Sequence, residues 1–85
     1  MYQVVKRDGK VAEFEISKIS AAITKAFDAL NKQYHPSVID MLALRVTAEY
    51  EPMIENGAVT VENIQDCVEK VLSEAGYADV AKRSE

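Results

Sequence analysis

From residue 16 onward, apolar residues recur three and four positions apart, which is the spacing of one face of an α-helix. The first such stripe comprises Ile19, Ala22, Ile23, Ala26, Phe27 and Leu30. Ser17 stands where its hydroxyl can accept from a free amide of the first turn, so we predict it as the cap, with Ile16 as a hydrophobic staple. The pattern therefore predicts a first amphipathic helix that begins after Ser17.

A second stripe follows a polar break and comprises Val38, Ile39, Leu42, Val46 and Tyr50. Pro36 suits the first position of this helix, where a missing amide donor does no harm. Pro52 cannot lie unmarked inside a helix, because it lacks the donor and clashes with the preceding turn. We therefore expect the second helix to end near Tyr50 or to kink there, with Met53 and Ile54 still packing inward.

A third stripe comprises Ile64, Val68, Val71, Leu72 and Ala75. Thr60 is predicted to cap this helix and Gly76 to end it. Residues 77–83 begin a fourth helical segment, which the last residue of the sequence cuts short. A helix of under two turns is too short to be stable alone, so we expect it to depend on the bundle.

The N-terminal residues predict a β-hairpin. Segments 2–6 and 10–14 contain the β-branched and aromatic residues typical of strands. Asp8 and Gly9 lie between them, and Asp-Gly favours a tight turn because glycine accepts a positive φ. Residues 58–59 follow an Asn-Gly turn and could form a very short third strand. An isolated hairpin is marginal in water, so the sequence predicts an α+β domain in which the hairpin caps a small bundle of three full helices and a truncated fourth.

Composition narrows the class of protein. The 85 residues make a single domain, and 48% of them are hydrophobic, which is too many for a disordered tail. No apolar run approaches the roughly 18 residues needed to span a bilayer, and no signal segment opens the chain. With one cysteine, Cys67, and one histidine, His35, neither a disulfide framework nor a transition-metal site is expected. We expect a cytoplasmic, metal-free domain.

The charge is unevenly distributed. Residues 1–25 hold five basic and three acidic residues, whereas residues 26–85 hold five basic and eleven acidic ones, and the whole chain has a net charge of −4. The acidic remainder would repel a long polyanion, so we expect no nucleic-acid partner. A cluster of cations near one end of an acidic protein instead favours a compact anion such as a nucleotide phosphate.

Four stretches of the sequence together resemble the ATP-cone family, in the order that family shows. They are Val4-Val5-Lys6-Arg7-Asp8-Gly9-Lys10, Phe14 with Ser17-Lys18-Ile19, Val59-Thr60-Val61-Glu62-Asn63-Ile64-Gln65-Asp66, and Glu74-Ala75-Gly76-Tyr77-Ala78-Asp79-Val80-Ala81-Lys82. The resemblance covers nearly the whole chain, so residues 1–85 are expected to form one ATP-cone domain. The family's last helix usually continues further, with a tyrosine- and arginine-bearing stretch, and its shortening here puts a phosphate contact in doubt.

The resemblance implies that ATP or dATP binds between the hairpin and the bundle as an allosteric ligand, with an accompanying Mg²⁺ left open. Lys6 and Arg7 would meet the phosphates, with Lys18 as a third cation. Val4 and Ile19 match positions that pack on the adenine. Two further positions match more loosely: Glu15, at a position that often contacts the base or sugar, and Thr60, at a phosphate-side position.

The residues alone are also compatible with purely structural roles that involve no ligand. Lys6, Arg7 and Lys10 could be solvated hairpin charges that blunt an edge strand. Lys18 could be a surface lysine, and Glu15 a simple exposed acid. No P-loop or dinucleotide fingerprint is present, and no catalytic constellation can be assembled from one cysteine and one histidine. We therefore expect nucleotide binding without hydrolysis.

The resemblance also implies a parent protein. We expect the N-terminal regulatory domain of a ribonucleotide reductase, partnered by the rest of the reductase chain and its other subunits, and controlling deoxyribonucleotide synthesis. Segment 42–47 and the N-terminal position resemble the anaerobic, triphosphate-reducing class. Two alternatives are the ATP-cone of a transcriptional repressor of reductase genes and a helical interaction module without a ligand.

Overall fold

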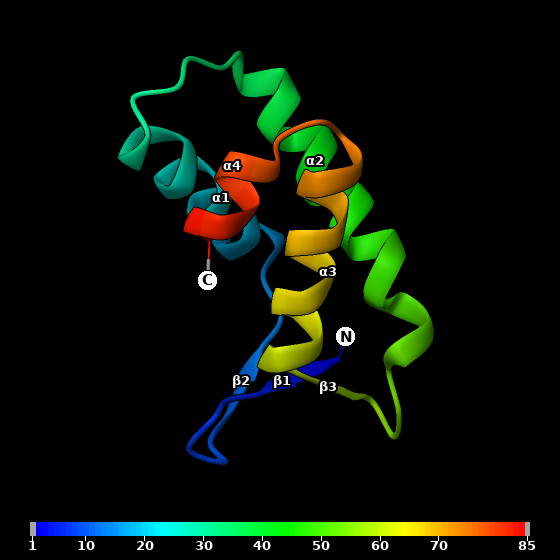
Figure 1. Ribbon diagram of the computed structural model, residues 1–85. Helices are drawn as coiled ribbons and strands as arrows, with labels where there is room; N and C mark the ends of the chain where they lie inside the picture. The colour runs from blue at the N-terminus through cyan, green and yellow to red at the C-terminus, as the bar shows by residue number, and fades with distance from the viewer. Residues whose placement is uncertain (1, 85) are drawn as a thin grey trace.

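The computed structural model describes residues 2–84 and begins with the predicted hairpin (Figure 1). Strand β1 (Gln3–Val5) pairs antiparallel with β2 (Val11–Glu13). A three-residue loop joins them, because the Lys6 amide donates to the Lys10 carbonyl oxygen at 2.8 Å. Gly9 lies in this loop with a φ of 84°, and the Asp8 carboxylate accepts from the Lys10 amide at 2.9 Å. The hairpin prediction is confirmed.

The short third strand is also confirmed. Strand β3 (Ala58–Thr60) pairs parallel with β1 on the side away from β2, so the sheet order is β2-β1-β3. The register places Val4 between Ala12 and Val59. The central strand β1 therefore joins the hairpin to the segment that leads into the third helix.

The first helix, α1 (Ile16–Ala29), begins earlier than predicted. The Lys18 amide donates to the Glu15 carbonyl oxygen at 3.0 Å, so the first turn already closes at Glu15. Glu15 is the cap residue and makes no side-chain cap bond, whereas Ser17 lies inside the first turn. The prediction of Ser17 as the cap was wrong by two positions. Ile16, predicted as a staple before the cap, is the first helical residue.

The second helix, α2 (Pro36–Tyr50), starts at the predicted proline, and the His35 ring accepts from the Ser37 amide at 3.1 Å. It ends at Tyr50 and continues as a 3₁₀ turn, η1 (Glu51–Met53), which accommodates Pro52 without a kinked α-helix. Ile54 contacts the core as predicted, and the Met53 sulfur lies 3.9 Å from the sulfur of the buried Cys67, although 42% of Met53 is exposed.

The third helix, α3 (Val61–Glu74), has the predicted cap: the Thr60 hydroxyl accepts from the Asn63 amide at 3.1 Å. At its other end Gly76 has a φ of 93°, and the Tyr77 amide donates back to the Leu72 carbonyl oxygen at 2.8 Å. This is the left-handed helix ending that glycine favours. A last helix, α4 (Ala78–Arg83), then packs against α3 and α1.

The core lies among the four helices. Its most deeply buried side chains, each with no exposed surface, are Ile23, Leu42, Val46, Tyr50, Leu72 and Val80. Phe27 joins them and makes edge-to-face contacts with Tyr34 and Tyr77, with ring centroids 5.5 and 5.1 Å away. Leu30 and Ala22, on the predicted stripe of α1, are exposed instead.

The sheet lies at the foot of the bundle beside the first turn of α3 (Figure 1). None of the helices within residues 2–84 has both the length and the apolar character required to cross a bilayer. The fold is therefore a small sheet against one end of a helical bundle, as the α+β prediction states.

Candidate functional site

A cleft of about 220 Å³ opens where the sheet meets α1 and α3. Its lining comes from β1, β2, the β2–α1 connection, the first two turns of α1 and the first two turns of α3. These residues are Val4, Lys6, Ala12, Glu13, Phe14, Glu15, Lys18, Ile19, Ala22, Val61, Ile64, Gln65 and Val68. Residues from three of the four stretches that resemble the ATP-cone family therefore meet in one cleft.

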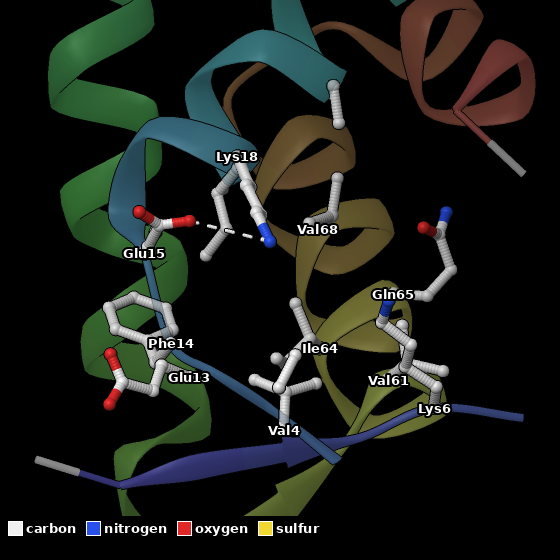
Figure 2. A pocket seen from close by; sticks show the side chains of 13 residues that line it. Val4, Lys6, Glu13, Phe14, Glu15, Lys18, Val61, Ile64, Gln65 and Val68 are labelled. Carbon is white, nitrogen blue, oxygen red and sulfur yellow. Dashed lines mark ion pairs between the residues drawn. The ribbon is translucent and has the colours of Figure 1, made fainter. Parts of the chain in front are cut away.

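The floor of the cleft is apolar. Figure 2 shows Val4 of β1 beside Ile64 of α3, with Val68 one turn further along the same helix. Ile19 and Val68 belong to the buried core, with 6% and 4% of their surface exposed, and Val4 and Ile64 are half-buried against it. The floor is therefore a firm apolar surface, of the kind that binds a flat ring.

The rim of the cleft carries the cations. Lys18 extends from the first turn of α1 over the floor, and its ammonium lies 3.4 Å from a Glu15 carboxylate oxygen (Figure 2). Both side chains are more than half exposed, so this ion pair contributes little to stability and can be exchanged for another anion. Lys6, at the end of β1, is exposed on the opposite side of the opening.

Gln65 connects the cleft to the C-terminal helix. Its side-chain amide nitrogen donates to the Ser84 carbonyl oxygen at 2.6 Å, just past the end of α4. The Ser84 hydroxyl in turn donates to the Ala81 carbonyl oxygen at 2.8 Å. One lining residue of the cleft therefore also satisfies a terminal carbonyl group of α4.

The structure brings five of the seven predicted site residues into the cleft lining: Val4, Lys6, Glu15, Lys18 and Ile19. Arg7 is not among the lining residues. Its guanidinium lies 3.4 Å from a Glu62 carboxylate oxygen in the first turn of α3, and both side chains are exposed.

Thr60 also lies elsewhere. It faces a separate hollow bounded by Val5, Met53, Ala58 and Asn63. Its hydroxyl is already bonded to the Asn63 amide. Thr60 therefore lies at the start of α3, but outside the cleft where the other five predicted residues meet.

Sequence reasoning did not identify the α3 side of the cleft. Val61, Ile64 and Val68 are spaced three and four residues apart, and the last two were predicted only as core. Their spacing could have indicated this side of the cleft. The apolar face of α3 begins one turn before the buried residues of that helix, and in this first turn α3 lies beside the sheet and not beside another helix. Ala12 was similarly missed, although it stands opposite Val4 in the register.

An aromatic cluster anchors the hairpin to the bundle. Tyr2 stacks on Phe14 with ring centroids 4.7 Å apart, and both rings meet Tyr50 edge-on, at 5.9 and 5.7 Å. The two tyrosine hydroxyls are 2.5 Å apart and hydrogen-bonded. Burial raises the pKa of Tyr50, helped by this bond, and burial is also the main cause of the raised pKa of Tyr2. The cluster lies next to the cleft, since Phe14 lines it.

The chain is similar to known proteins along nearly its whole length. The sequence model of the ATP cone domain matches residues 2–84. The chain is 44% identical over 85 residues to a ribonucleoside-diphosphate reductase subunit alpha of Chlamydia pneumoniae, covering 93% of the chain and 8% of that protein. It is 38% identical over 80 residues to a vitamin B12-dependent ribonucleoside-diphosphate reductase of Mycobacterium tuberculosis, covering 94% and 11%.

A third relative, a ribonucleoside-diphosphate reductase subunit alpha of Chlamydia trachomatis, is 39% identical over 87 residues, covering 93% of the chain and 8% of that protein. The chain thus spans about a tenth of the length of these relatives. Their names are those of diphosphate reductases, and none names the anaerobic, triphosphate-reducing class expected from the sequence.

Proposed function

Because the chain belongs to the ATP cone domain family, we propose that it is an allosteric nucleotide-binding domain that controls a ribonucleotide reductase. The observation that carries this proposal is the cleft between hairpin and bundle, with an apolar floor and lysines on its rim. An apolar floor suits a purine base, and ammonium groups suit phosphates, because charge-assisted bonds are about twice as strong as neutral ones. The domain would bind nucleotide without changing it.

The adenine would lie on the floor against Val4 and Ile19, with Ile64 on the α3 side. A cleft of about 220 Å³ is smaller than the roughly 300–1,000 Å³ of most ligand pockets, so the base alone would be enclosed. The sugar and phosphates would then extend over the rim, within reach of Lys6 and Lys18. Glu15 would have to release Lys18, which its exposed position allows.

Two further contacts carry over from the resemblance. Arg7 would reach the phosphates only after leaving Glu62, an exchange that an exposed pair permits. Thr60 would act through the first turn of α3, whose free amides and dipole favour an anion. The cleft lining contains two acidic side chains, Glu13 and Glu15. A Mg²⁺ ion needs six oxygen ligands, so an ion that accompanies the triphosphate would draw its ligands mainly from phosphate oxygens.

The regulatory role requires the domain to distinguish ATP from dATP. The two ligands differ only in the 2′-hydroxyl, and Glu15 is the residue we propose to meet the sugar. High ATP would permit ribonucleotide reduction and high dATP would stop it, through a coupling of about 1–3 kcal/mol. The 2′-hydroxyl and the Lys18 ammonium would therefore compete for the Glu15 carboxylate.

The parent protein is proposed from the relatives. All three are ribonucleoside-diphosphate reductases, which favours a diphosphate-reducing parent over the anaerobic class that the sequence suggested. The same relatives favour a reductase over a transcriptional repressor. The ligand-free interaction module is disfavoured by the family, because the chain matches the ATP cone domain over residues 2–84.

A calorimetric titration of the 85-residue chain with ATP and with dATP tests the proposal. Saturable binding of both, with no phosphate release above the buffer blank, is the expected result. Lys18→Ala should weaken binding about tenfold or more, roughly 1.4 kcal/mol, since it removes a charged partner of the phosphates.

Lys25→Ala is the matched control, because Lys25 lies two turns further along α1, also exposed, and outside the cleft lining. It should leave affinity within about twofold, as expected for a distant surface charge. Equal losses in the two variants would mean that only overall charge matters, and absence of binding would favour the ligand-free module.

A further inference from the structure

Helix α2 has a second apolar face that nothing in the domain covers. Met41 is 44% exposed and Leu44 is 62% exposed, the most exposed large apolar side chain among residues 2–84. On the opposite side of the same helix, Ile39, Leu42, Ala43 and Val46 are buried in the core. The helix forms one edge of the bundle (Figure 1), so this outer face is open along its length.

The outer face has the spacing of a coiled-coil seam. Ser37, Met41, Leu44 and Ala48 follow one another at intervals of four, three and four residues, which makes Met41 and Ala48 position a and Ser37 and Leu44 position d of a heptad. The buried residues of α2 then occupy positions b, c and f. The helix therefore presents two separate faces, one for its own core and one for another helix.

The flanking charges specify the partner. Asp40 occupies position g and Arg45 occupies position e, and both are exposed. Neither takes part in the ion pairs found within residues 2–84. In a parallel pair of helices, position g of one helix meets position e five residues later in its partner. Asp40 and Arg45 are five residues apart and of opposite sign.

We propose that the outer face of α2 is a self-association surface, on which a second copy of this chain packs its own α2 in parallel. The two-fold axis would run along the seam, so that Leu44 meets Leu44 of the second copy and Met41 meets Met41. Two ion pairs would form by symmetry, each between Asp40 of one copy and Arg45 of the other.

The reverse orientation is disfavoured by the same charges. In an antiparallel pair, position g meets g and position e meets e, so Asp40 of one copy would not meet Arg45 of the other and both ion pairs would be lost. The surface is also independent of the cleft, because α2 contributes no residue to the cleft lining. Two heptads make a short seam, so the dimer is weak and forms at high protein concentration.

Sedimentation equilibrium of the 85-residue chain, up to millimolar concentration, is the first test. A concentration-dependent dimer is expected, and Leu44→Gln should raise its dissociation constant at least tenfold. Leu30→Gln is the matched control, because Leu30 is also exposed but lies at the end of α1, and it should leave the dimer unchanged. A monomer at every concentration, or equal effects of the two variants, would overturn the proposal.

Charge reversal tests the pairing. Asp40→Arg and Arg45→Asp should each abolish the homodimer, because each places like charges at positions g and e. An equimolar mixture of the two variants should form a heterodimer, because positions 40 and 45 then carry opposite charges in both contacts. Ala48→Cys tests the orientation, because parallel helices place the two thiols together and oxidation should link them, against the background of the buried Cys67 in the parent chain. Dimers that are insensitive to Asp40→Arg, or that fail to cross-link at residue 48, would overturn the parallel arrangement.

Discussion

The helical core and the hairpin end of the molecule are held together in different ways. In the core, six side chains from α1, α2, α3 and α4 have no exposed surface. At the hairpin end, the three strands have three residues each, and Val59 is their one fully buried residue within residues 2–84. The hairpin end relies instead on a backbone ladder and on the cluster of Tyr2, Phe14 and Tyr50.

The comparison shows how a small domain can separate stability from binding. Burial of apolar surface dominates folding free energy, so the core should set the global stability. A region with few buried contacts opens locally at lower free energy, and the cleft lies at that end. A ligand that contacts both β1 and α1 would therefore change the local stability of the hairpin end far more than that of the core.

The largest effect should follow a change in the core. Leu72→Ala removes a side chain with no exposed surface and should lower the free energy of unfolding by about 2–5 kcal/mol, through lost burial and a cavity. Leu44→Ala is the matched control, since the same substitution at an exposed helical position should change stability by about 0.5 kcal/mol or less. Urea denaturation at low protein concentration measures both.

Similar losses in the two leucine variants would contradict this division of the molecule. It would mean that the exposed face of α2 is buried in the folded monomer, or that Leu72 is not.

A smaller effect is expected at alkaline pH, from the aromatic cluster. The pKa values of Tyr2 and Tyr50 are raised above the ordinary 10.0, so the folded state holds these protons more tightly than the unfolded state. The resulting stability is fully present below pH 10 and is lost as pH rises through the folded pKa values. The slope contributed by one tyrosine cannot exceed about 1.4 kcal/mol per pH unit, the value for one proton.

Tyr50→Phe isolates this contribution, because it keeps the ring and removes the buried hydroxyl. At neutral pH its stability should lie within about 1.5 kcal/mol of the parent, the value of one hydrogen bond. Above pH 10 the variant should lose stability less steeply than the parent. Parallel curves for the two proteins in urea titrations from pH 8 to 11 would show that the cluster does not titrate as described.

The smallest effect should come from the junction of the two regions, at Thr60. Thr60→Ala removes the cap of α3 and should cost about 1 kcal/mol, whereas Thr60→Ser keeps the hydroxyl and most of the stability. Because Thr60 lies outside the cleft lining, ATP affinity should fall less in Thr60→Ala than in Lys18→Ala. A loss as large as that of Lys18→Ala would support the phosphate contact predicted from the resemblance.

The sequence predicted the elements well, because their signals are local. The hairpin, the short third strand, Pro36, Thr60 and the Gly76 ending are set by residues within a few positions of each other. The Ser17 prediction failed because the Lys18 amide donates to the Glu15 carbonyl oxygen, which starts the helix two positions earlier than the capping pattern indicates.

What the sequence could not predict depends on distant residues. Tyr2 and Tyr50 are 48 positions apart, and no local pattern indicates that their hydroxyls meet. The pairing of Arg7 with Glu62 likewise depends on how close β1 lies to the start of α3. Ala22 is exposed because the cleft opens over the first turns of α1, although the helical stripe alone predicts it as buried.

The central claim is that nucleotide binds in the cleft and ties the hairpin to the bundle. Amide hydrogen exchange of the chain, with and without ATP, tests it most directly. ATP should slow exchange in residues 2–14 and in the first turn of α1, and much less around Ile23, Leu42 and Val68, in conditions where local opening dominates. Protection confined to α2 and the later turns of α3, with the hairpin unchanged, would contradict the claim.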